Sequence, residues 1–205
     1  KDLTENSTQK KWVVSITGAS GIIYGIRLIS YLVRQPCRII LILSGAAHEV
    51  IKAEMGANST DVKKFLETQG VTPCHEASLE IRNPDDFSAP CASGSFTHDG
   101  MVIIPCSMKT LAQVAAGIAD NLITRSADVC LKERRPLILV IRETPYSLIH
   151  IENMKTATLA GATILPASPS FYSRPETIEK LVDTVNARVL DNLNIRHDLI
   201  SPWGL

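Results

Sequence analysis

The chain alternates between short apolar runs and longer stretches in which apolar residues recur at helical spacing. The apolar runs cover residues 12–16, 38–43, 101–104, 137–141 and 162–165. Because consecutive positions of a strand point to opposite faces, such runs predict strands that are buried on both faces of a parallel sheet. The helical spacing predicts helices over residues 22–34, 46–55, 109–119, 122–134, 148–160 and 175–193. This alternation predicts an α/β fold, a Rossmann-like doubly wound parallel sheet in three αβα layers.

The segment between residues 58 and 100 carries the weakest pattern. It predicts a helix over residues 61–69 and then a polar stretch interrupted by Pro73, Pro84 and Pro90. Long loops in compact domains are often functional, and an ordinary surface loop is the equal alternative. Residues 1–11 are polar and lack the apolar centre of a signal peptide, so we expect a disordered lead-in before a single domain over residues 12–205.

Composition is typical of a soluble globular domain. Of the 205 residues 45% are apolar, and 21 acidic residues balance 21 basic ones, which gives no argument for nucleic acid or an anionic membrane. No apolar run reaches the ~18 residues that span a bilayer. Five cysteines without C-x-x-C spacing favour reduced thiols in a cytoplasmic protein, and the five histidines show no metal-ligand spacing, so we predict no metal site.

A glycine-rich turn, Thr17-Gly18-Ala19-Ser20-Gly21, follows the first predicted strand and precedes a helix. Backbone N–H groups at a helix N-terminus attract phosphate, so the turn predicts a phosphorylated ligand. We expect the strand at 101–104 beside the first strand, where the strand order reverses and such sheets bind ligands. The turn of residues 106–110 follows that strand, and the pair of turns suits a mononucleotide. Ser107 and Thr110 suit helix capping equally well.

A nicotinamide cofactor is the main competitor for such a turn. The second predicted strand ends in Ser44-Gly45, where a nicotinamide-binding fold would carry an acidic residue for the ribose. No tyrosine is followed four positions later by lysine, so the pair used by short-chain dehydrogenases is missing. Ser44 either approaches the phosphorylated ligand or caps the next helix.

Charged residues suggest a second anion site. Arg142 and Glu143 directly follow the apolar run 137–141, on the presumed ligand side, where a structural salt bridge is the alternative. Arg125 and Lys132 lie seven residues apart and hence on one helix face, where Asp128 can pair with Lys132. With Arg142 they predict a basic pocket for a second phosphate.

Taken together, these motifs resemble the flavin prenyltransferases of the UbiX/Pad family. The matching segments are residues 17–21, 24–27, 92–95, 105–111, 125–136, 142–145 and 171–175, within a resemblance that runs from Trp12 to Trp203. The resemblance implies a flavoprotein-type fold and transfer of a dimethylallyl group from dimethylallyl phosphate to N5 and C6 of reduced FMN, with no metal. It also implies trimers, commonly dodecamers, with the active site at subunit junctions, and a UbiD-type decarboxylase that receives the prenylated FMN.

The resemblance assigns candidate site residues. FMN is expected to contact Gly18, Ala19, Ser20, Ser44, Ser107, Met108, Lys109, Thr110 and Arg142. Dimethylallyl phosphate is expected to meet Tyr172 and Arg188, with Ser93, Gly94, Lys132 and Glu143 nearby and Arg125 and Glu54 close to the site. Catalytic roles fall to Glu143 (as a proton relay), Lys132, Ser93 and Glu54. Phe87 stands where some relatives carry Trp, which weakens any cation–π contribution there.

Two other functions remain open at this stage. One is an FMN-dependent decarboxylase that acts directly on an aromatic acid such as 3-octaprenyl-4-hydroxybenzoate. The other is a non-catalytic FMN carrier that only supports a decarboxylase. A test of flavin mass after incubation with reduced FMN and dimethylallyl phosphate separates the transferase from both.

Overall fold

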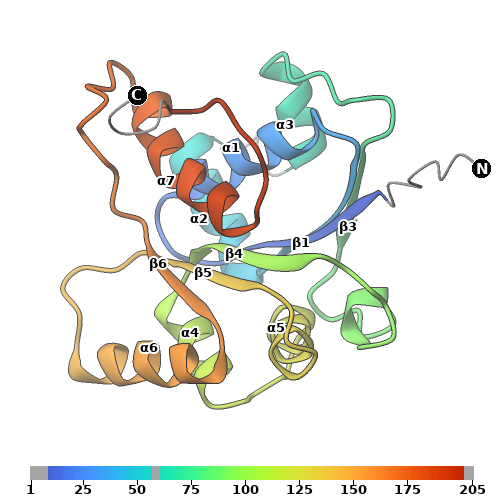
Figure 1. Ribbon diagram of the computed structural model, residues 1–205, viewed down its shortest axis with the longest axis vertical. Coiled ribbons are helices and arrows are strands. Elements are labelled where there is room, and N and C mark those ends of the chain that lie inside the picture. The colour runs from blue at the N-terminus through green and yellow to red at the C-terminus, as the bar shows by residue number, and fades with distance from the viewer. Residues whose placement is uncertain (1–8, 57–60, 201–205) are drawn as a thin grey trace, which may run out of the picture.

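Parallel strands form the centre of the molecule, with helices on both faces (Figure 1). The computed structural model describes residues 9–56 and 61–200. Within them the strands are β1 (Lys10–Ile16), β2 (Cys37–Leu43), β3 (Ser78–Arg82), β4 (Gly100–Cys106), β5 (Leu137–Ile141) and β6 (Thr163–Pro166). The sheet order is β3-β2-β1-β4-β5-β6, and every pairing is parallel. The predicted doubly wound sheet is confirmed.

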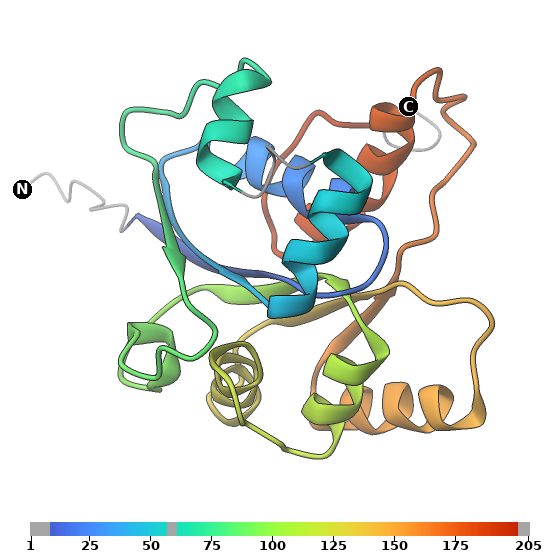
Figure 2. The ribbon, with the colours of Figure 1, turned by 180° about the vertical axis from the view of Figure 1, so that it is seen from behind.

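Helices cover the sheet in two layers. They are α1 (Ile22–Leu32), α2 (Gly45–Met55), α3 (Val62–Thr68), α4 (Met108–Ala115), α5 (Leu122–Lys132), α6 (Leu148–Ala160) and α7 (Ile178–Asn192), with a short 3-10 helix η2 (Pro90–Ala92). The first three helices and α7 lie on one face, and α4, α5 and α6 lie on the other (Figures 1 and 2). Each face has its own apolar cluster, one centred on residues such as Ile16 and Leu28, the other on Met101 and Leu111.

The strand order reverses between β1 and β4. β1 pairs with β2 on one side and with β4 on the other, where Val13 lies opposite Met101. The predicted neighbourhood of these two strands is therefore confirmed. In such sheets the loops after the two strands at the reversal diverge to opposite faces and leave a crevice at the carboxyl edge.

The edge strand β3 corrects the prediction of a long irregular segment after residue 69. β3 pairs with β2 from Arg38↔Ser78 to Ile42↔Arg82. Ion pairs from Arg38 and Arg82 to Glu80 line one face of it. Half-exposed edge strands lack continuous apolar runs, and the two-residue alternation at 78–82 was the available signal.

Most predicted boundaries hold to within a few residues. β1 begins at Lys10, inside the expected lead-in, because Lys10 pairs with Cys37 at the start of β2. The rest of that lead-in and Trp203 lie outside the described residues. α7 begins later than predicted because Thr177 caps it by accepting from the N–H of Lys180. In the described part of the chain, no helix is long and apolar enough to cross a membrane.

Candidate functional site

A buried threonine joins the two loops at the reversal of strand order. The Thr17 hydroxyl donates to the carbonyl of Pro105 at 2.8 Å and accepts from the backbone N–H of Ser107 at 2.8 Å. The Thr17 N–H also donates to Pro105 at 3.2 Å, and the residue is 1% exposed. The turns after β1 and β4 are thus fixed side by side, as the sequence predicted.

Serine side chains cap the helices that open at this edge. Ser44 accepts from the N–H of Ala47 at 3.1 Å at the start of α2, and Ser107 accepts from the N–H of Thr110 at 3.3 Å at the start of α4. The capping alternative is therefore confirmed at both positions. The first amides of an α-helix have no acceptor within the helix, so both N-termini can bind an anion.

The glycine turn packs directly on the first turn of α2. A Cβ atom added at Gly18 would lie 2.5 Å from the Cβ of Ala46, so only glycine fits. Ala19 is buried and Ser20 is exposed at the tip. The predicted FMN residues on the loop after β1, at Ser44 and at 107–110 are therefore brought together along one edge of the sheet.

The N-terminus of α1 corrects the expected phosphate position. The carboxylate of Glu54, near the end of α2, accepts from the N–H of Gly21 at 2.9 and 3.1 Å and from that of Ile22 at 2.9 Å. A negative side chain is favourable at a helix N-terminus. The expectation of open amides at this helix start is wrong for these two residues, because Glu54 already occupies them. The predicted catalytic residue Glu54 lies beside the glycine turn.

Arg142 and Glu143 lie at the carboxyl end of β5 and are exposed. Burial raises the pKa of Tyr24 on α1, and the positive charge of Arg142 opposes that rise. Glu143 accepts from the N–H of Thr144 at 2.9 Å. In the described part of the chain no ion pair joins Arg142 to Glu143, so the salt-bridge alternative is not found.

A second group of predicted residues lies along α5. Arg125 donates to the carbonyl of Ala92 at 2.9 Å and pairs with Asp128 at 2.9 Å. Lys132 pairs with Glu133 at 2.5 Å, and the hydrogen bond from Lys132 lowers the pKa of Glu133. The alternative pairing of Asp128 with Lys132 is not found in the described residues, because Asp128 pairs with Arg125 and Lys132 with Glu133.

The loop of residues 92–96 completes this second group. A Cβ atom added at Gly94 would lie 2.8 Å from the Nζ atom of Lys132, so the loop backbone lies against that side chain. The hydroxyls of Ser93 and Ser95 lie 2.8 Å apart and are exposed. Ser93, Gly94, Arg125 and Lys132 are thus brought together.

The two groups do not meet within one chain. Lys132 ends α5 before β5 begins, whereas Arg142 follows the opposite, carboxyl end of β5. Figure 1 shows the green segment before β4 to the right of α5, and the segment after β5 at the far left, beyond α4. The prediction of one basic pocket is wrong for Lys132 and Arg142 in the single chain, because α5 ends at the edge where β5 begins and Arg142 lies at the opposite end of β5.

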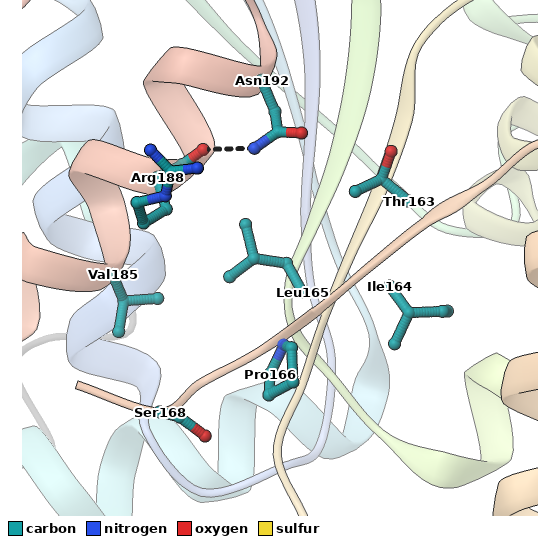
Figure 3. A pocket seen from close by; sticks show the side chains of 8 residues that line it. All are labelled: Thr163, Ile164, Leu165, Pro166, Ser168, Val185, Arg188 and Asn192. Atoms are coloured by element: carbon teal, nitrogen blue, oxygen red, sulfur yellow. Dashed lines mark hydrogen bonds between the residues drawn. The ribbon is translucent and has the colours of Figure 1, made fainter. Parts of the chain in front are cut away.

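The last two predicted substrate residues lie in the C-terminal part of the chain, Tyr172 on the loop before α7 and Arg188 on α7 itself. The loop with Tyr172 starts at the carboxyl edge, where the N–H of Ala167 donates to Ile141 at 2.9 Å. Tyr172 is 80% exposed. Arg188 pairs with Asp191 at 2.6 Å. Arg188 borders a pocket of about 290 Å³ between α7 and the edge strand β6 (Figure 3); its lining is Thr163, Ile164, Leu165, Pro166, Ser168, Val185, Arg188 and Asn192.

Sequence reasoning gave no role to several residues that hold these groups. Thr17 lay within a recognised motif, but its bridging hydroxyl depends on a partner loop 90 residues away. Glu133 and Asp191, which pair with the predicted cations, had only their proximity in sequence as a signal. Phe87 is exposed on the segment before η2.

The thiols and histidines show no reactive cluster. All five cysteines are unbonded, and burial raises the pKa of Cys106 and of Cys130 to about 12, so both are neutral thiols. Across residues 9–56 and 61–200 no group of three His, Cys, Asp or Glu side chains is placed to hold a metal ion.

Comparisons with known proteins show which proteins this chain is similar to. Residues 1–190 match the family model described as Flavoprotein. The flavin prenyltransferase UbiX of Alkalihalophilus pseudofirmus is 46% identical over 197 residues, which are 96% of this chain and 97% of the relative. The crystal structure of AnUbiX (PadA1) in complex with FMN and dimethylallyl pyrophosphate is 40% identical, with a TM-score of 0.86 over 96% of this chain and 98% of that one.

A second solved structure is described as a dodecameric FMN-dependent Ubix-like decarboxylase from Escherichia coli O157:H7. It is 41% identical, with a TM-score of 0.84 over 94% of this chain and 98% of that one. Together these structures confirm the predicted flavoprotein-type α/β fold.

Proposed function

This chain belongs to the flavin prenyltransferase UbiX family, and from that membership we propose that it transfers a dimethylallyl group from a dimethylallyl phosphate ester to reduced FMN. The allylic C1–O bond breaks and its electron pair leaves with the phosphate, while C1 bonds to N5 of the flavin and the N5 proton is released. The remaining double bond then takes up a proton at C2, and C3 bonds to C6 of the flavin, which loses its own proton. The observation that carries the proposal is the Thr17-linked pair of loops at the strand reversal. It occurs in a chain 40% identical to a structure that holds FMN and dimethylallyl pyrophosphate.

The carboxyl edge of the sheet fits a flavin mononucleotide. The N-termini of α2 and α4 supply amides without acceptors in their own helices, and Arg142 supplies a nearby cation. Gly18 leaves room for close backbone approach beside α2. In this proposal Gly18, Ala19, Ser20, Ser44, Ser107, Met108, Lys109, Thr110 and Arg142 hold FMN, which supplies the nucleophilic ring when it is bound.

The cations fit the leaving phosphate. Lys132, Arg188 and the hydroxyl of Tyr172 can stabilise the departing charge through charge-assisted hydrogen bonds without a metal, with Ser93, Gly94 and Arg125 beside them. To bind phosphate, Lys132 would give up its ion pair with Glu133, and Arg188 its ion pair with Asp191. These pairs are exposed, so breaking them costs little free energy. Glu143 moves a proton between flavin and phosphate, with Glu54 close to the turn.

An active site at a subunit junction explains why the predicted residues form separate groups in one chain. α6 presents Leu148 at 72% and Leu159 at 79% exposure, while Ala157 on the same helix is fully buried. Large apolar side chains that gather on an exposed surface often mark an interface, and here a second copy of the chain is the proposed cover. The dodecameric relative supports a dodecamer, and the family resemblance implies that trimers build it.

The product is proposed to serve a UbiD-type decarboxylase, which uses the prenylated flavin. Five unbonded cysteines support a location in the reducing cytoplasm. The family resemblance carries the first statement, and the cysteines carry the second.

Anaerobic incubation of the protein with reduced FMN and dimethylallyl monophosphate, and separately with the diphosphate, tests the function. Mass spectrometry of the extracted flavin should show one added dimethylallyl unit. The reaction should proceed without added metal ions. An unchanged flavin together with release of CO₂ from an aromatic acid would instead support direct decarboxylation. If the protein is only an FMN carrier, Arg142→Ala and Lys132→Ala should lose function only to the extent that they lose FMN affinity. If it is the enzyme, Lys132→Ala should lose turnover while it still binds FMN.

A further inference from the structure

We propose that Arg135 is a positioning residue that holds the loop of residues 92–96 against Lys132. The inference rests on the proposed function and deepens it, because this loop and Lys132 carry the proposed donor site. Arg135 itself touches neither donor nor flavin in this proposal.

The Arg135 guanidinium spans the loop with two donors. Its Nη1 group donates to the carbonyl of Phe96 at 2.8 Å, and its Nη2 group donates to the carbonyl of Gly94 at 2.7 Å. Arg125 donates to the carbonyl of Ala92 at 2.9 Å. Three carbonyls at every second position are therefore held by arginines from α5 and its end, and the planar fork of Arg135 fixes two of them at once.

The held carbonyl belongs to the residue that lies against Lys132. A Cβ atom added at Gly94 would lie 2.8 Å from the Lys132 Nζ atom and in closer conflict with the carboxylate of Glu133. Any shift of the loop therefore changes the space beside the Lys132 ammonium. Because a hydrogen bond to Gly94 sets that position, Arg135 acts on the donor site through the loop.

The end of α5 explains why this arginine, and not its neighbour, reaches the loop. Arg134 adopts a left-handed conformation with φ of 55°, and the N–H of Arg135 donates to the carbonyl of Cys130 at 2.8 Å. This reversal is a common helix ending. It leaves Arg134 exposed, and in the described part of the chain its side chain makes no hydrogen bond or ion pair.

Adjacent arginines with equal charge provide a matched pair of variants. Arg135→Ala should raise the KM for dimethylallyl phosphate at least tenfold, while the Kd for FMN stays within twofold, because the flavin residues lie at the other edge. Arg135→Lys should recover part of the KM, since an ammonium can serve one carbonyl. Arg134→Ala should match wild type in both. An unchanged KM in Arg135→Ala, or a parallel loss of FMN affinity, would overturn the proposal.

Hydrogen exchange separates this inference from the function itself. Amides of residues 92–97 should exchange at least tenfold faster in Arg135→Ala than in Arg134→Ala, while thermal unfolding shows that both variants are folded. Equal exchange rates in the two variants would show that Arg135 does not hold the loop, whether or not the protein prenylates flavin. If the wild-type protein prenylates no flavin but the loop still exchanges fast in Arg135→Ala, the proposed function is refuted. The hydrogen bonds from Arg135 would then still hold the loop, but not for the proposed reaction.

Discussion

The hydroxyl of Thr17 accepts a hydrogen bond from the backbone N–H of Ser107 at 2.8 Å. The same hydroxyl donates to the carbonyl of Pro105, so one side chain satisfies two groups of the neighbouring loop. Both loops follow central strands of the sheet, and each leads into a helix that begins at the carboxyl edge, α1 after the first loop and α4 after the second. These contacts hold the two loops side by side at the proposed flavin crevice.

Replacing Thr17 by valine should weaken FMN binding and the fold together. Valine keeps the shape but leaves the partly buried N–H of Ser107 without its acceptor, which costs about 1 kcal/mol. Titration of FMN fluorescence and urea unfolding measure the two effects. Thr17→Ser retains the hydroxyl and should keep most of the FMN affinity; equal losses in both variants would argue against the hydrogen bond as the cause.

Removing the Glu54 carboxylate should destabilise the start of α1. Glu54→Ala leaves the N–H groups of Gly21 and Ile22 without an acceptor, a loss comparable to that of a helix cap at about 1 kcal/mol. Chemical unfolding gives the free energy. Glu49 is exposed on the same helix and makes no contact of this kind in the described residues, so Glu49→Ala should stay within about 0.5 kcal/mol of wild type. Equal stability of the two variants would refute the capping role.

Stability should fall as the pH drops below about 6.5 because of His98. Burial, with help from the charge of Arg135, lowers the pKa of His98 below its ordinary value of 6.5. The unfolded chain therefore takes up a proton at a pH where the folded chain does not, and this favours unfolding. Urea unfolding between about pH 7 and pH 5 should show a shallower pH dependence for His98→Gln than for wild type. His75→Gln, at an exposed position, should retain the wild-type slope.

A charge on the open side of α6 should break the assembly. Leu159→Asp places a carboxylate at an apolar position that is 79% exposed in the single chain. If a second copy covers it, burial of the charge opposes association. Light scattering should report smaller particles with intact secondary structure. Lys63→Asp, on α3 at the opposite face of the sheet, is the control and should leave the particle size unchanged.

The central sheet was predictable because its strands are buried on both faces. The runs at residues 137–141 and 101–104 coincide with β5 and with the middle of β4, and the reversal next to β1 follows from connection rules. β3 was not predicted, because Glu80 and Arg82 alternate with its apolar residues at an exposed edge of the sheet. A pattern search tuned to continuous apolar runs misses such a strand.

The site was predictable as a set of residues but not as an arrangement. The capping of Gly21 by Glu54 joins positions 33 residues apart, and no local pattern encodes it. The separation of Lys132 from Arg142 follows from the direction in which α5 runs, although their short distance in sequence favours one pocket. Contacts between elements, and between copies of the chain, are set by packing that a linear pattern does not contain.

In the proposed assembly, two copies of the chain complete each prenyl-transfer site together. Co-expression of a Lys132→Ala chain with an Arg142→Ala chain, each with its own affinity tag, tests this directly. Assemblies of either variant alone should form almost no prenylated FMN. Mixed assemblies isolated through both tags should recover up to about a quarter of the wild-type yield. With random mixing, about a quarter of the sites receive an intact Lys132 from one chain and an intact Arg142 from the other. Verified mixed assemblies that remain as inactive as the separate variants would contradict a shared site.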